Sequence, residues 1–267
     1  MTEFWEAGLV LLLLLGSSAA GLYLRPLLPE RHWNAETNDL VRLVGTMLVT
    51  FAAIVLGLLI TTAKSSFDTV ENDVRGYGVD IIELDRVLRQ YGPETDPIRK
   101  ELRAYTASAI ATTWDQEAPP PGDYYPKAPP RGASDAEMEN SSLGEILNRI
   151  EMDLRRFEPA DAMHRKLAAD SIIKFERLLN RRWKLIEEAH TTISVQFLGM
   201  LSLWMVVVFA GFGISAPRNP LVIIMLALGA FSIASSIFVI LDLGTPFNGF
   251  FAVSSEPLRQ ALDHLNR

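Results

Sequence analysis

The amino-acid sequence predicts an all-α integral membrane protein with four transmembrane helices and a helical cytoplasmic domain inserted between spans 2 and 3. Three observations predict this fold class. Of 267 residues, 49% are hydrophobic. Four windows are apolar over about 20 residues, the helical length that crosses a bilayer core of about 30 Å. The polar sequence between the second and third windows has the 3.6-residue periodicity of amphipathic helices rather than that of strands.

The four apolar windows are residues 4–24, 43–63, 193–215 and 221–241. No Asp, Glu, Lys or Arg lies in the middle of any window, where a charge would cost a few kcal/mol. The chain opens with Met1-Thr2-Glu3-Phe4-Trp5-Glu6, which lacks the Lys or Arg of a signal peptide, so we expect the first window to be an uncleaved span. Spans 3 and 4 are joined by a turn containing Pro217 and Pro220, which predicts an antiparallel hairpin.

We therefore predict four regions along the chain. Residues 1–64 hold spans 1 and 2, residues 65–192 form the helical domain, residues 193–241 form the transmembrane hairpin, and residues 242–267 form a C-terminal tail. Basic residues near the span ends are more numerous on the side of the helical domain. By the positive-inside rule, the domain and both termini are therefore cytoplasmic.

The helical domain begins as a continuation of span 2, because residues 64–68 contain no Pro or Gly. This helix should end at Gly92-Pro93, and a second helix should follow from Asp96 to about Trp114. An irregular, proline-rich loop is expected over residues 118–140. The apolar seam of the first helix alternates spacings of four and three: Val70, Val74, Tyr77, Ile81, Leu84, Leu88 and Tyr91.

Two further helices complete the predicted domain. Ser142 and Glu145 form a capping box that opens the third helix, whose apolar face comprises Leu143, Ile146, Leu147, Ile150, Leu154 and Phe157. The fourth helix begins near Asp161 and should run unbroken through His190 into span 3. Its predicted apolar stripe comprises Ile172, Phe175, Leu179, Trp183 and Ile186.

Two segments of the chain resemble the bacterial bestrophin-like family of membrane proteins. The first holds Asn38, span 2 and Phe67-Asp68; the second holds Leu241-Asp242, the run Pro246-Phe247-Asn248-Gly249, and Glu256-Pro257. The resemblance implies a bestrophin layout, in which pentameric anion channels have four spans and a helical cytosolic domain. It also implies a homo-oligomer, most simply a pentamer, in the bacterial inner membrane. The sequence departs from the family pattern by placing Leu243-Gly244-Thr245 between the Asp and the Pro.

Calcium-gated bestrophins carry an acidic clasp after the last span. Here Gly249 is followed by six residues without a carboxylate before Glu256. Because calcium needs six to eight oxygen ligands, we predict no calcium clasp and no metal site.

Span 2 carries a stripe of polar and small residues that we predict to line a pore: Thr46, Thr50, Ala53, Gly57, Thr61 and Lys64. Their spacing places them on one helical face. Copies of this helix around an axis would form hydroxyl-lined rings and a ring of Lys64 ammonium groups that favours anions. The alternative is that Ala53 and Gly57 let two helices pack closely while Lys64 reaches the headgroups.

The segment after span 4 forms a predicted C-terminal turn of Asp242, Pro246, Phe247 and Gly249. Asp242 is expected either to pair with Lys64 or Arg182 and gate the pore, or to be a solvated interfacial carboxylate. Pro246, Phe247 and Gly249 are expected to fold the tail back, because Pro fixes φ and Gly permits close approach.

The sequence predicts no enzyme and no cofactor. Four histidines are widely separated and lack metal-ligand spacing, Gly-x-Ser-x-Gly is absent, and the chain has no cysteine. A net charge of −7 argues against nucleic acid as a partner. We expect a homo-oligomeric, anion-conducting channel whose partners are its own copies, the lipid bilayer and permeating ions. The alternatives are a membrane-anchored helical scaffold or sensor without conduction and, less favoured, a small-solute transporter.

Overall fold

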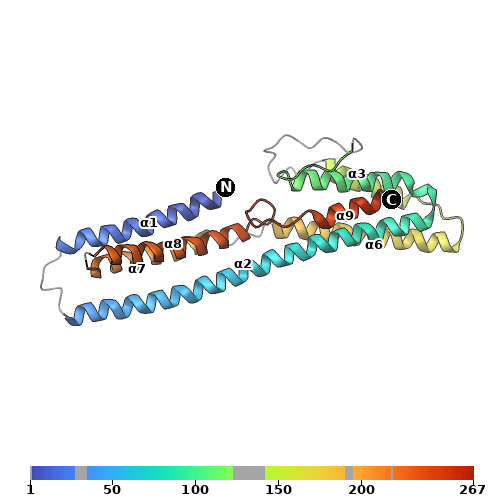
Figure 1. The fold of residues 1–267 in the computed structure, drawn as a ribbon. Coiled ribbons are helices and arrows are strands. Elements are labelled where there is room, and N and C mark those ends of the chain that lie inside the picture. Colours follow the sequence, from blue (N-terminus) through green and yellow to red (C-terminus); the bar gives the residue numbers. More distant parts are fainter. Residues whose placement is uncertain (1, 28–34, 123–141, 190–194, 218) are drawn as a thin grey trace. The chain divides into compact units, whose positions relative to one another are not determined.

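The computed structural model describes residues 2–27, 35–122, 142–189, 195–217 and 219–267. Every regular element in these ranges is helical, and four helices are long and apolar enough to cross a membrane. The predicted fold class is therefore confirmed: the chain is an all-α, multi-pass membrane protein (Figure 1). It divides into two compact units, residues 1–67 with 191–251 and residues 68–190 with 252–267.

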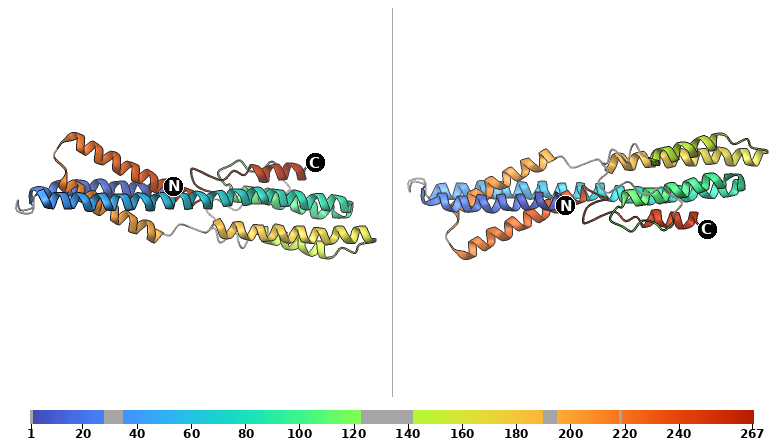
Figure 2. Two further views of the ribbon diagram at one scale, coloured as in Figure 1. Left: turned by 90° about the horizontal axis from the view of Figure 1, so that it is seen from below. Right: turned by 90° about the horizontal axis from the view of Figure 1, so that it is seen from above.

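The membrane unit contains α1 (Thr2–Leu24), the first part of α2 (Ala35–Tyr91), α7 (Val195–Ser215) and α8 (Pro220–Leu243). In Figure 1, α7 and α8 lie between α1 and the first part of α2, and Figure 2 shows α7 and α8 diverging from their shared connection. One apolar cluster draws residues from all four helices. At the start of α8, the Asn219 side chain accepts a hydrogen bond from the Leu221 N–H at 3.0 Å, which caps the helix.

Two glycines let α1 and α7 approach at backbone contact. A Cβ on Gly21 would overlap the carbonyl oxygen of Ala210, and a Cβ on Gly213 would overlap that of Ser18. Small residues allow this approach between transmembrane helices, where packing rather than hydrophobic burial drives association.

Helix α2 continues for 57 residues from span 2 into the second unit, as predicted. It ends before Gly92, whose φ of 129° is a conformation that favours glycine. All seven residues of the predicted seam between Val70 and Tyr91 are buried. The alternating spacing of four and three residues therefore identified the inner face of this helix correctly.

The second unit is completed by α3 (Asp96–Thr113), α5 (Ser142–Arg155), α6 (Ala162–Ala189) and α9 (Glu256–Leu265). Helix α3 packs on α5 and α9, and α5 packs on α6. The predicted apolar face of α5 is buried from Leu143 to Leu154. Most of the proline-rich loop and the predicted continuity through His190 lie outside the described residues.

The predicted apolar stripe of α6 is partly wrong. Phe175 is buried, but Trp183 is 50% exposed and the neighbouring Arg182 is buried instead. The inner face comprises Leu167, Ala168, Ser171, Phe175, Leu178 and Arg182. The reason is that Arg182 hydrogen-bonds the buried Tyr105 hydroxyl, a tertiary contact that hydropathy alone does not reveal.

Candidate functional site

The six predicted pore residues of α2 lie on an exposed face of the membrane unit. Thr46, Thr50, Ala53, Gly57, Thr61 and Lys64 are all exposed. A Cβ on Gly57 would meet nothing within 4 Å among the described residues. No described helix of the chain itself therefore packs closely on Gly57, and the alternative of close packing between two helices stays open for contacts between copies. Whether this face lines a pore stays a prediction.

A second face of α2 packs against the chain's own helices. Ala52 is 2% exposed, Leu56 9% and Ala63 1%, and all three belong to the apolar cluster shared with α1, α7 and α8. This face fixes the rotation of α2 about its axis. The polar stripe consequently points away from the rest of the membrane unit.

The third face of α2 is apolar and largely exposed, although the centre of the Phe51 ring lies 5.5 Å from that of Trp204 in α7. Its residues recur at spacings of four and three and are 47–65% exposed: Leu40, Val44, Met47, Phe51, Ile54 and Leu58. With 3.6 residues per turn, the buried, polar and exposed apolar faces have centres about 120° apart. Span 2 therefore presents three distinct surfaces along its length.

Two hydroxyl groups of the polar stripe, those of Thr50 and Thr61, bond to their own helix. Thr50 Oγ1 donates to the Thr46 carbonyl at 2.9 Å, and Thr61 Oγ1 donates to the Gly57 carbonyl at 2.9 Å. The hydroxyl donors are thus satisfied while the oxygens stay on the exposed face. At the end of the stripe, Lys64 Nζ lies 5.4 Å from the centre of the Phe67 ring, within cation–π range.

Asp242 is buried rather than solvated, and whether it gates the pore stays a prediction. It is 1% exposed, and its carboxylate oxygens accept hydrogen bonds from the N–H groups of Phe250 at 2.6 Å and Phe251 at 2.8 Å. A Cβ on Gly249 would lie 3.0 Å from Asp242 Oδ1. Asp242 therefore holds the segment after α8 in a turn, and the expectation of a solvated interfacial carboxylate is wrong.

The remaining predicted turn residues lie inside this loop. Pro246 is buried and Phe247 is half-buried, while Gly249 N–H donates to the Thr245 carbonyl at 3.0 Å. The exposed rings at the end of the loop belong to Phe250 and Phe251, 75% and 44% exposed. The inserted Leu243-Gly244-Thr245 extends α8 to Leu243 and starts the turn at Gly244.

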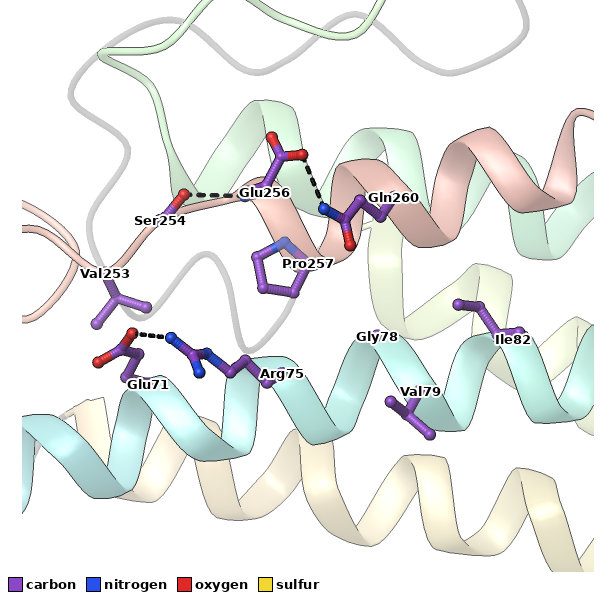
Figure 3. Close-up of a pocket in the computed structure, with 10 residues that line it drawn as sticks. All are labelled: Glu71, Arg75, Gly78, Val79, Ile82, Val253, Ser254, Glu256, Pro257 and Gln260. Carbon is purple, nitrogen blue, oxygen red and sulfur yellow. Dashed lines mark hydrogen bonds and ion pairs between the residues drawn. The ribbon is translucent and has the colours of Figure 1, made fainter.

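In the second unit, Gly76 and Gly78 flank Tyr77 on α2, and their lack of side chains leaves space for neighbouring segments. A Cβ on Gly76 would collide with the guanidinium group of Arg181, and a Cβ on Gly78 would lie 2.7 Å from the carbonyl oxygen of Pro257. Gly78 and Pro257 are both among the residues that line a pocket of about 490 Å³ beside this contact (Figure 3). The two glycines let α6 and the C-terminal segment approach α2 on either side of Tyr77.

Tyr77 is the centre of a buried polar cluster. Its hydroxyl shares a hydrogen bond with the hydroxyl of Tyr105 in α3, and Tyr105 also bonds Arg182 of α6. Burial raises the pKa of Tyr105, although Arg182 and the bond from Tyr77 oppose that shift. The cluster therefore joins α2, α3 and α6 through hydrogen bonds between their side chains.

Ion pairs join α2 to α6 along the same stretch. Asp80, which is 2% exposed, accepts hydrogen bonds from Arg177 Nε at 2.7 Å and Arg181 Nε at 2.6 Å. One turn on, Glu83 pairs with Arg177 and Lys174. Because the acids and bases recur every three or four residues on their helices, the sequence spacing carries a signal for this contact.

Comparison with known proteins agrees with this architecture. The bestrophin-like domain matches residues 12–258, nearly the whole chain. The chain belongs to the bestrophin-like family. A comparison with curated protein sequences finds no match.

Solved structures resemble this bestrophin-like protein over its full length. A tryptophan-to-alanine mutant of a bacterial bestrophin homologue from Klebsiella pneumoniae is 15% identical, with a TM-score of 0.67 over 100% of this chain and 99% of that chain. A leucine-to-threonine mutant of a bestrophin homologue from the same organism is 15% identical, with a TM-score of 0.64 over 97% of each chain. At this identity the likeness establishes the fold alone.

Among the described residues, no group of three or more His, Cys, Asp or Glu side chains is placed to hold a metal ion. The segment between Gly249 and Glu256, where calcium-gated bestrophins carry acidic ligands, supplies hydrogen-bond donors to Asp242 instead. The absence of a calcium clasp stays a prediction from the sequence.

Proposed function

We propose that this bestrophin-like protein is a homo-oligomeric ion channel that conducts anions through a central pore lined by the polar stripe of α2. The observation that carries the proposal is the three-faced surface of span 2. One face, with Ala52 and Leu56, is covered by the chain itself, while the polar and apolar faces are both largely exposed.

The two largely exposed faces have different chemistry and suit different neighbours. The apolar face suits lipid or the apolar surface of an adjacent copy, because exposed residues such as Met47 and Leu58 gain from leaving water. The polar face suits water, since Thr50 and Thr61 keep hydroxyl oxygens on it. Rotational symmetry brings equivalent faces of all copies together at the axis. A ring of copies with the polar stripe inward satisfies both faces.

The pore entrance is formed by Lys64 in this arrangement. Repeating one ammonium group around the axis concentrates positive charge at the end of span 2, which favours anions. The pentamer is the assembly that the family resemblance implies, in the bacterial inner membrane. The positive-inside rule places both termini and the helical unit on the cytoplasmic side.

The test is ion flux through the purified protein in liposomes under chloride and potassium gradients. Thr50→Trp fills the polar face, and Met47→Trp adds the same ring to the neighbouring apolar face as the matched control. Conduction that Thr50→Trp blocks and Met47→Trp preserves supports the pore along α2. Lys64→Glu should move the reversal potential toward that of a cation pore.

Three outcomes bear against the proposal. If Thr50→Trp and Met47→Trp conduct equally, α2 does not line the path. If the assembled protein carries no current under any gradient or pH, the membrane-anchored scaffold or sensor becomes the better account. A reversal potential that Lys64→Glu leaves unchanged removes the role of Lys64 in selecting anions.

A further inference from the structure

The loop after α8 carries two exposed phenylalanines at the edge of the membrane unit. Phe250 and Phe251 are 75% and 44% exposed, and the centres of their rings lie 5.3 Å apart. Both belong to the membrane unit, whose last residue is Phe251. They follow Leu243, the last residue of α8, by only seven and eight positions. Exposed aromatic rings so close to the end of a transmembrane helix face either lipid or another protein surface.

The sequence around the two rings has no charged side chain that would favour water. The 13 residues between Asp242 and Glu256 include no Asp, Glu, Lys or Arg. Asp242 itself is buried, and its carboxylate accepts hydrogen bonds from the N–H groups of Phe250 and Phe251. The loop therefore exposes apolar rings without the charged side chains that are typical of a solvated surface.

The backbone of the loop also suits a region of low water content. Irregular backbone lies at membrane depth only where its polar groups are bonded within the protein, because an N–H group without an acceptor is costly there. The N–H groups of Phe250 and Phe251 donate to Asp242 at 2.6 and 2.8 Å. Four further N–H groups donate to carbonyl oxygens of the same turn at 3.0–3.3 Å: those of Gly244, Thr245, Asn248 and Gly249. Asp242 thus closes a turn whose exposed surface is aromatic.

The start of α1 lies at the same end of the membrane unit. The centre of the Phe4 ring is 4.5 Å from that of Phe238, near the end of α8. Trp5, beside Phe4, is 81% exposed, and the exposed Tyr23 lies about 27 Å further along α1 at about 1.5 Å per residue. This separation is close to the thickness of a hydrocarbon core, and Trp and Tyr are enriched at its two boundaries. The start of α1 and the end of α8 therefore lie at one boundary of the bilayer.

We propose that Phe250 and Phe251 insert into the phospholipid layer at this boundary and anchor the loop after α8 to the membrane. Asp242 positions the two rings by closing the turn. The rings extend the exposed apolar surface of the spans, on which residues such as Leu228 of α8 also lie, and their transfer from water to lipid is favourable. The chain is thereby held at the bilayer just before it enters the helical unit at Ala252. This anchor does not require that the protein conducts ions.

The test is fluorescence quenching by nitroxide-labelled phospholipids in liposomes that contain the full chain. Because the chain has no cysteine, single cysteines can be introduced and labelled with an environment-sensitive fluorophore. Phe250→Cys places the label in the loop. Leu228→Cys, on the exposed surface in the middle of α8, is the lipid-facing reference. Asp263→Cys, at an exposed position of α9, is the water-facing control.

The label at position 250 should be quenched severalfold more than the label at position 263, and most strongly by a nitroxide on the headgroup or the upper acyl chain. The label at position 228 should instead be quenched most by a nitroxide deep in the acyl chain. Asp242→Ala releases the turn, so it should lower the quenching at position 250 and leave the quenching at position 228 unchanged. Circular dichroism verifies that each labelled variant retains its helices.

Three results would overturn this anchor. Quenching at position 250 that is no greater than at position 263 means that the rings lie in water. Blue-shifted emission at position 250 without quenching by lipid means that another copy of the chain covers them. Quenching at position 250 that Asp242→Ala leaves unchanged removes the role of Asp242 in positioning the rings. Because the readout is quenching by lipid, a protein that carries no current can still support the anchor.

Discussion

Gly78 of α2 faces the carbonyl oxygen of Pro257 so closely that a Cβ at position 78 would lie 2.7 Å from it. Pro257 sits in the first turn of α9, and Leu258, Ala261, Leu262 and Leu265 of that helix are buried. The C-terminal segment is thus an integral part of the helical unit, and its close contact with α2 depends on the absence of a side chain at Gly78.

Gly78→Ala should therefore destabilise the helical unit. An alanine gains about 1 kcal/mol in helix propensity over glycine, but the added methyl group meets backbone, and such overpacking costs about 1–3 kcal/mol. The measurement is thermal unfolding of the purified protein, with a lowered Tm expected.

The matched control is Gly144→Ala in α5, where a Cβ meets nothing within 4 Å among the described residues. This variant should raise Tm or leave it unchanged. If Gly78→Ala also raises Tm, the contact with Pro257 is not tight in solution.

Asp242→Ala should release the turn that follows α8. The substitution leaves the N–H groups of Phe250 and Phe251 without their acceptor, and a hydrogen bond to a charged group contributes about 1.5–3 kcal/mol. Hydrogen exchange followed by mass spectrometry should show faster exchange at these two amides.

Asp242→Asn is the informative partner variant, since its amide keeps one acceptor oxygen. It should protect one of the two amides and lose less stability than Asp242→Ala. Equal exchange in Asp242→Ala and the native chain would contradict the role of Asp242 in holding the turn.

Sequence periodicity correctly predicted the inner face of a helix where the buried residues are all apolar. The seam from Val70 to Tyr91 is buried because each member is apolar and regularly spaced. Helix α9 was missed because it has only ten residues, although Ser255, Pro257 and the spacing of its leucines are typical of a short amphipathic helix.

Sequence periodicity could not predict polar contacts between segments that lie far apart in the sequence. Arg182 is buried because Tyr105, 77 positions earlier, supplies a hydrogen-bond partner, and hydropathy ranks the neighbouring Trp183 as the inner residue. Asp242 is buried because the chain returns to it eight residues later. The polar stripe of span 2 was visible in the sequence, but its exposure depends on the opposite face packing against three other helices.

Acid should weaken the attachment of the C-terminal segment through Glu117. Burial alone would raise the pKa of Glu117, but hydrogen bonds from Ser255 and Arg259 outweigh it and lower the pKa below the ordinary 4.5. A carboxyl group with a lowered pKa contributes stability above its unfolded value, and that stability is lost as pH falls through the folded pKa.

We therefore expect the α9 amides of the native chain to lose protection from hydrogen exchange below pH 4.5. In the Glu117→Gln variant, the same amides should already be less protected at neutral pH. The control is Glu256→Gln, because Glu256 bonds only locally to Gln260 at 3.0 Å in the described contacts. Equal acid sensitivity of α9 in Glu117→Gln and the native chain would exclude Glu117 as the titrating group.

The start of α6 should show the opposite pH dependence through His164. Asp161 caps the helix by accepting a hydrogen bond from the His164 N–H at 2.8 Å, and its Oδ2 lies 2.9 Å from His164 Nδ1. The bond to Asp161 raises the pKa of His164 above the ordinary 6.5. A histidine with a raised pKa stabilises the folded state below its unfolded value, and this contribution disappears as pH rises through the folded pKa.

Asp161→Asn separates the charge of Asp161 from its capping role, because asparagine caps a helix with similar strength but carries no charge. The His164 resonance, followed by NMR against pH, should therefore titrate at a lower pH in Asp161→Asn than in the native chain. An unchanged His164 midpoint would mean that the ion pair with Asp161 does not form in solution, and the start of α6 would then owe its stability to the backbone cap alone.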